Sequence, residues 1–76
     1  MMSDIQNFTV IAERENNGFV ALCPKLDVAS QGNTVEEAKF NLQEAIELLF
    51  EHASKDEIAS RLKIDVFMTN MRIAVG

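Results

Sequence analysis

Few side chains in this sequence have types and positions suited to chemistry, and they are scattered along the chain. One cysteine, Cys23, lies in an apolar run, and one histidine, His52, lies far from it in the sequence. An activated thiolate needs cationic neighbours or a helix N-terminus, so we interpret Cys23 as a buried structural thiol. Two such ligands are too few for a structural zinc site, which uses about four. We therefore expect no catalytic residues, no bound metal and no cofactor.

Carboxylates are the remaining candidate groups, and three of them share one side of a predicted helix. At about 100° per residue, Glu44, Glu47 and Glu51 fall opposite the apolar stripe of that helix. Phe40 falls on the same outer side, where an aromatic side chain has no role in the core. A run of charges alone usually marks a solvated face, but an aromatic anchor framed by charges is typical of an interface. We predict that these four residues bind a protein partner.

Length and charge limit the possible functions further. The chain has 76 residues and forms one domain, residues 1–76, with twelve acidic and seven basic residues and a net charge of −5. This charge argues against direct binding to nucleic acid or to anionic membranes, and it favours a basic protein partner. Domains this small usually gain stability from a metal, disulfides or a partner subunit. Because one cysteine and one histidine supply neither of the first two, we expect a homo-oligomer, either a dimer or a tetramer.

The distribution of apolar residues predicts the compartment. Residues 1–7 are polar and contain no apolar signal-peptide core. No apolar run approaches the roughly 18 residues that a membrane span requires. Together with the single thiol, these features predict a cytoplasmic protein without contact to membranes.

Three short strands are predicted before the helix. Within residues 8–14, one face carries Phe8, Val10 and Ala12 and the other carries Thr9, Ile11 and Glu13, the period of two expected for a strand. The Glu-Asn-Asn-Gly turn at 15–18 suits a hairpin. Residues 19–23 are apolar at every position, which indicates a strand covered on both faces. Pro24 ends that strand because it has no N–H to donate. Residues 28–31 form a third, short strand.

A capping box predicts where the long helix begins. The Thr34 hydroxyl accepts a hydrogen bond from the N–H of Glu37, and the Glu37 carboxylate accepts one from the N–H of Thr34. The helix then runs over residues 35–53. Its apolar stripe has the spacing of three and four residues that an amphipathic helix needs. The stripe consists of Val35, Ala38, Leu42, Ala45, Ile46, Leu49 and Ala53.

Two further elements complete the predicted fold. A second capping box at 54–57 begins a short helix that ends at Leu62, and residues 64–75 form a last, apolar strand. The predicted fold is α+β, with the order β-β-β-α-(α)-β. It has a three- to four-stranded, mainly antiparallel sheet and one long helix on one face. Because one helix covers one face only, we expect a second copy to cover the other face.

A family resemblance is carried by a continuous block of residues. Residues 19–38 combine an apolar strand, a Pro-x-Leu turn, a Ser-Gln-Gly segment and a Thr-x-Glu-Glu-Ala helix start, and residues 41–48 continue the helix. Over residues 8–53 the chain resembles the HicB-like antitoxin family. The resemblance implies a partial ribonuclease-H-like fold. Four of the matching residues have structural roles in our interpretation: Gly32 in the turn, Thr34 and Glu37 in the helix cap, and Ala38 in close packing.

The resemblance implies a role in a type II toxin–antitoxin system. Such antitoxins bind and neutralise a small basic toxin, HicA-like and of double-stranded-RNA-binding-like fold, which cleaves mRNA. They act without chemistry of their own. Full-length relatives carry a C-terminal DNA-binding domain, whereas this chain ends at Gly76, so we expect no such domain and no operator binding.

Two alternatives belong to other functional classes. The first is an oligomeric small-molecule-binding or regulatory domain without catalysis, which requires a pocket with convergent polar groups. The second is a metal-dependent nuclease, which requires several carboxylates around two metal ions. The nuclease is disfavoured because Glu13 is the one acidic residue on either face of the predicted first strand, and Asp65 and Glu37 complete no obvious triad with it.

Overall fold

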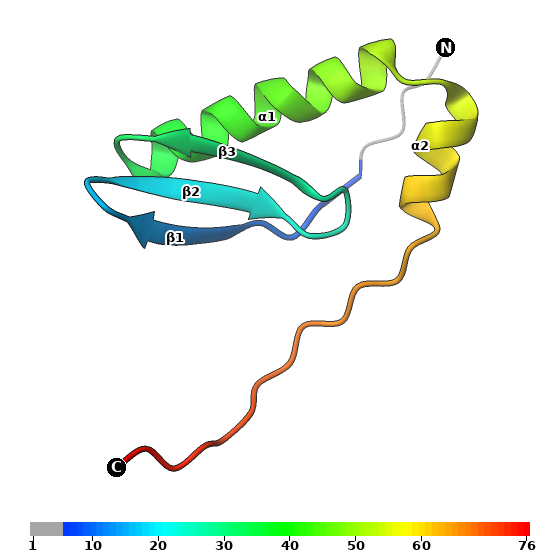
Figure 1. The fold of residues 1–76 in the computed structure, drawn as a ribbon. Coiled ribbons are helices and arrows are strands. Elements are labelled where there is room, and N and C mark those ends of the chain that lie inside the picture. The colour runs from blue at the N-terminus through cyan, green and yellow to red at the C-terminus, as the bar shows by residue number, and fades with distance from the viewer. Residues whose placement is uncertain (1–5) are drawn as a thin grey trace.

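The computed structural model describes residues 6–76 and confirms the α+β class (Figure 1). Three antiparallel strands form one sheet in the order β1-β2-β3, and the long helix α1 lies on one face of it. The five elements are β1 (Ile11–Glu15), β2 (Gly18–Cys23), β3 (Val28–Gly32), α1 (Val35–His52) and α2 (Lys55–Leu62). Residues 1–5 lie outside the described residues. They belong to the polar stretch from which we predict that the chain has no signal peptide.

Strand β1 begins later than the sequence predicts. Its pairing with β2 runs from Ile11 opposite Leu22 to Glu15 opposite Gly18. In this register, residue 9 would face Pro24, which has no N–H to donate. The pairing therefore stops near Pro24, and residues 8–10 continue without a strand partner.

Both helices begin at the predicted caps, but each capping box closes differently from the prediction. The Glu37 N–H donates to the Thr34 hydroxyl at 3.0 Å, whereas the Glu37 carboxylate accepts from the Asn33 N–H at 2.6 Å, one residue earlier than predicted. At α2, the Glu57 N–H donates to the Ser54 hydroxyl at 3.1 Å. The Glu57 carboxylate instead pairs with Arg61, one turn along the helix, at 3.3 Å.

The core lies between α1 and the sheet and is small. Its buried side chains are Ala21, Cys23, Leu26, Ala38 and Leu42. Gly32 permits the close approach of β3 to the start of α1, because a Cβ there would lie 2.4 Å from the Ala38 nitrogen. The Asn41 side chain also donates a hydrogen bond of 2.7 Å to the Gln31 carbonyl, which ties α1 to β3. Gly32 therefore serves close packing rather than the turn role that we predicted for it.

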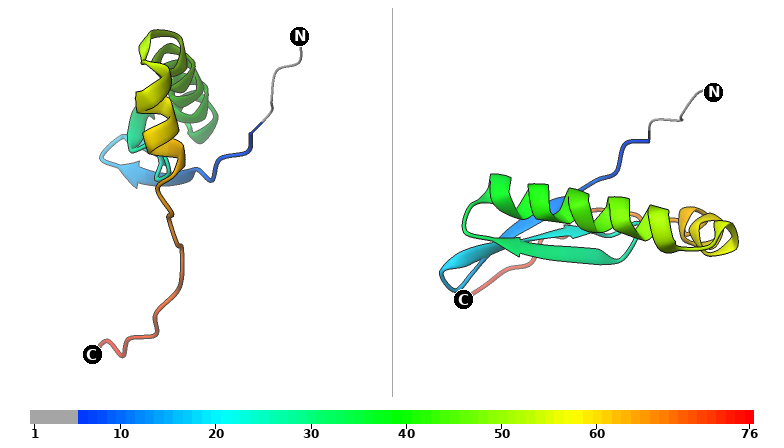
Figure 2. Two further views of the ribbon diagram at one scale, coloured as in Figure 1. Left: turned by 90° about the vertical axis from the view of Figure 1, so that its right-hand side faces the viewer. Right: turned by 90° about the horizontal axis from the view of Figure 1, so that it is seen from above.

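The predicted last strand is not formed. Residues 64–76, called the arm below, are extended but pair with no strand in the described part of the chain. Figures 1 and 2 show the arm leaving the end of α2 on the side of the sheet away from α1. The Cα radius of gyration is 14.8 Å, against about 11 Å for a compact chain of this length. An extended segment becomes a strand only beside a partner, and the arm has none among residues 6–76.

Within residues 6–76, neither helix is long and apolar enough to cross a lipid bilayer.

Candidate protein-binding surface

The four predicted partner-binding residues lie together on the outer side of α1. Phe40 is 61% exposed, and Glu44, Glu47 and Glu51 are also exposed. Helical geometry places all four within an arc of about 60° and along about 16 Å of the helix axis. We call Phe40, Glu44, Glu47 and Glu51 the acidic face of α1.

The amphipathic pattern of α1 explains why this face points outward. Ala38 and Leu42 are buried against the sheet, and Ile46 and Leu49 pack beside them. The acidic face therefore lies on the opposite side of the helix, away from the sheet. The burial of Ala38 and Leu42 against the sheet is therefore sufficient to point the acidic face outward.

The helix α1 is strongly acidic. The helix carries five glutamates and one lysine, Lys39. Contacts to the acidic face come from neighbours on the same helix. The Gln43 side chain donates to the Glu47 carboxylate at 3.2 Å, and His52 Nε2 lies 3.7 Å from Glu51 Oε1. Since none of these contacts involves lysine or arginine, the carboxylates stay available for basic groups from outside.

One further residue on this surface escapes the sequence prediction. Leu48 is 54% exposed and lies one turn beyond Glu44, about 80° around the helix from Phe40. Leu48 is thus a second exposed apolar side chain on α1, beside the acidic face. The signal was present in the sequence, because Leu48 also falls outside the apolar stripe of α1.

The residues considered for metal or nucleophilic chemistry are dispersed. Cys23 is buried within the core. Glu13 is exposed on β1, Glu37 belongs to the helix cap and Asp65 lies on the arm. In residues 6–76, no three or more histidine, cysteine or acidic side chains cluster closely enough to hold a metal ion.

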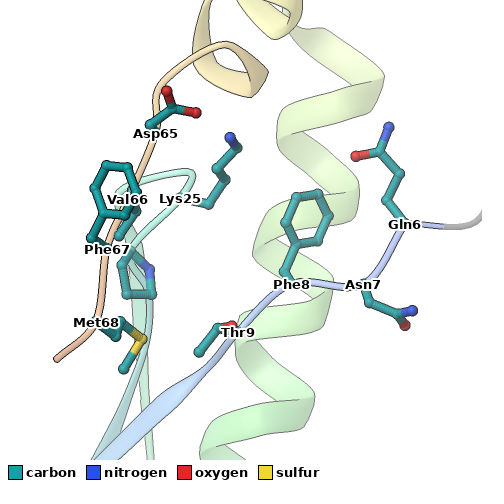
Figure 3. Close-up of a pocket in the computed structure, with 10 residues that line it drawn as sticks. Gln6, Asn7, Phe8, Thr9, Lys25, Asp65, Val66, Phe67 and Met68 are labelled. Atoms are coloured by element: carbon teal, nitrogen blue, oxygen red, sulfur yellow. The ribbon is translucent and has the colours of Figure 1, made fainter.

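A groove of about 420 Å³ lies between two extended segments (Figure 3). Residues 6–9 line one side, and residues 65–68 at the start of the arm line the other. Pro24 and Lys25 lie between them, and the Lys25 ammonium donates a hydrogen bond to the Ile64 carbonyl. The sequence prediction missed this groove, because its two sides are almost sixty residues apart and only the tertiary structure places them together.

The fold defines a small α+β protein with one antiparallel sheet and one long helix, and comparison with known proteins adds the family. A UPF0150 protein of Synechocystis sp. is 51% identical over 49 residues, which cover 62% of each chain. A second UPF0150 protein of that organism is 40% identical over 48 residues, or 62% of this chain and 67% of the relative. A UPF0150 protein of Helicobacter pylori is 37% identical over 65 residues, covering 84% and 90%.

The chain therefore belongs to the UPF0150 family. It spans 62% of the length of the first Synechocystis relative. No family model matches the chain, and no solved structure does so significantly.

Proposed function

We propose that this UPF0150 protein is a HicB-like antitoxin. It binds a small basic toxin that cleaves mRNA, in the cytoplasm, and neutralises the toxin by covering its active surface without catalysis of its own. The observation that carries the proposal is the acidic face of α1, which presents an exposed aromatic side chain among three carboxylates. The resemblance of residues 8–53 to HicB-like antitoxins supports the same role.

The chemistry of this face matches what a basic toxin requires. Complementary charges speed the encounter of two proteins and orient them, while a buried aromatic anchor supplies much of the affinity. Phe40 would fill an apolar pocket of the toxin. The glutamates would lie opposite lysines and arginines that otherwise contact RNA, so toxin binding and mRNA binding would compete.

The first experiment is co-expression of this chain with the small basic protein encoded beside it. The expected result is a complex that survives purification and suppresses mRNA cleavage by the toxin. If the neighbouring protein is not toxic alone and forms no complex, the antitoxin proposal fails. A small molecule retained by the purified chain would then favour the small-molecule-binding alternative.

Two variants test whether the acidic face makes the contact. Phe40→Asp is expected to weaken toxin binding at least 30-fold, because removal of an interface hot spot costs about 2 kcal/mol or more. The triple change of Glu44, Glu47 and Glu51 to glutamine is expected to weaken binding about tenfold and to reduce its salt dependence, since each exposed ion pair contributes about 0.2–1 kcal/mol.

A matched control removes the same charge elsewhere. Glu15→Gln, Asp27→Asn and Asp56→Asn change three exposed acids that lie off the acidic face. This control is expected to bind the toxin within threefold of the parent. Equal losses for the two triple variants would indicate that overall charge, and not the acidic face, determines binding. Circular dichroism checks that each variant keeps its helices.

A further inference from the structure

The arm has the pattern of a strand but lacks a partner. Every second side chain from residue 67 to residue 75 is apolar apart from one threonine. These apolar side chains are 70% to 90% exposed, and they are Phe67, Met71, Ile73 and Val75. The opposite side of the arm carries Asn70 and Arg72 together with the apolar Val66, Met68 and Ala74. A segment with one apolar and one partly polar side is typical of a strand that covers a core on one face.

The sheet offers a matching acceptor at its β1 side. β1 lies at one end of the strand order, so its outer edge pairs with no strand within residues 6–76. Unprotected edges are rare in natural sheets because they pair with other chains. The groove between residues 6–9 and 65–68 continues this edge toward the N-terminus (Figure 3). The outer edge along residues 6–15 therefore pairs with no strand in the described part of the chain.

The face of the sheet away from α1 carries a small apolar cluster beside this edge. Ala21 and Cys23 are buried toward α1, so the alternation along β2 directs Val20 and Leu22 to the other face. Ile11 lies opposite Leu22 and shares that face. The apolar side of a strand added beside β1 would contact Ile11 directly, with Leu22 and Val20 behind it on β2.

We propose that the arm pairs with the β1 edge of a second copy of this chain, and that two copies exchange arms reciprocally in a symmetric dimer. The lengths agree, because twelve extended residues of the arm span about 40 Å and residues 6–15 span about 33 Å. Exchange of identical elements is a common route to dimers, and strand addition at an edge supplies main-chain hydrogen bonds.

Charge favours a second copy over the basic toxin as the occupant. Residues 64–76 carry one acid, Asp65, and one base, Arg72, and so have no net charge, although the whole chain carries −5. Pairing of the two arms, which have no net charge, with the two sheets therefore adds no electrostatic repulsion between the two acidic chains. A basic partner gains no electrostatic attraction from this neutral apolar segment, whereas it does from the acidic face of α1.

The area that reciprocal exchange buries also favours a second copy. With large apolar side chains of order 100–200 Å² each, one arm buries roughly 600 Å² of its own surface and a similar area of its acceptor. Two arms together then bury about 2,400 Å², which reaches the range of stable dimers, whereas one arm on another protein gives only about half of that.

Sedimentation equilibrium of the full chain tests the proposal without any toxin, so its outcome is independent of the antitoxin proposal. The expected mass at micromolar concentration is twice the 8.5 kDa of one chain. Ile73→Asp is expected to weaken the dimer at least 100-fold, because it places a charge on the apolar side of the arm. Asn70→Asp adds the same charge on the other side and is expected to leave the dimer within threefold of the parent.

A second measurement identifies the acceptor. In a dimer made from equal parts of isotope-labelled and unlabelled chain, nuclear Overhauser contacts from the Ile73 methyl groups to those of Ile11, on the edge strand, are expected between the two chains. The proposal is overturned if the full chain is a monomer with these contacts within one molecule. A dimer that persists unchanged in Ile73→Asp also overturns it.

Discussion

Replacing Gly32 by alanine is the change for which the structure makes the sharpest prediction. Gly32 ends β3 where the strand lies against the first turn of α1. A Cβ at this position would lie 2.4 Å from the Ala38 nitrogen, 2.8 Å from the Glu37 carbonyl carbon and 2.9 Å from the Ala38 Cα. All three neighbours are backbone atoms, so no side-chain rotation relieves the overlap. β3 and α1 must therefore move apart.

The size of that movement gives the expected loss of stability. Ordinary van der Waals contact begins at 3.4 Å, so the two elements must separate by about 1 Å. Overpacking of this kind costs about 1–3 kcal/mol, and the rigid backbone places Gly32→Ala near 3 kcal/mol. A chain of this length has a total unfolding free energy of about 4–11 kcal/mol. The change therefore removes a large fraction of it and lowers Tm by roughly 12–24 °C.

Thermal unfolding followed by circular dichroism measures this effect. All variants must be compared at one protein concentration, because self-association raises the apparent Tm. Gln31→Ala, at the exposed neighbour on β3, serves as the control and is expected to change stability by less than about 0.5 kcal/mol. A Tm of Gly32→Ala within 3 °C of the parent would falsify the claim that Gly32 is required for close packing.

Two further predictions concern the core and the first helix cap. Leu42→Ala is expected to lower the unfolding free energy by about 2–5 kcal/mol because Leu42 is buried, whereas Leu48→Ala, at an exposed position on the same helix, is expected to cost less than about 1 kcal/mol. Chemical denaturation measures both, and similar losses would contradict the helix orientation. Thr34→Ala is expected to cost about 1 kcal/mol by removing the acceptor for the Glu37 N–H. Thr34→Ser keeps that acceptor and should retain most of the stability; an equal loss in both variants would contradict the capping role.

The elements with local signals were predicted closely. The long helix begins at Val35, as the capping box at Thr34 requires, and the short helix begins after Ser54 for the same reason. The phase of α1 also follows from its own residues, because Ala38 and Leu42 face the core. The exposed position of Phe40 was therefore predictable from helical spacing alone.

The strand boundaries were predicted less well because pairing is a property of two segments. Residues 8–10 have the alternation of a strand, yet β1 begins at Ile11 because pairing stops near Pro24 of the neighbouring strand. The Glu37 carboxylate accepts from Asn33 rather than Thr34, since the path of the chain into the helix sets that geometry.

The sequence by itself determined the α+β class, the starts of the two helices and the side of α1 that carries Phe40 and its glutamates. Those features depend on hydrogen bonds and apolar spacing within about one helical turn, which neighbouring residues specify. The tertiary structure alone decided the packing role of Gly32, the groove beside residues 6–9 and the separation of the arm from its own sheet. These features depend on which distant segments meet, and alternating side chains at 64–75 specify a strand without specifying the sheet that it joins.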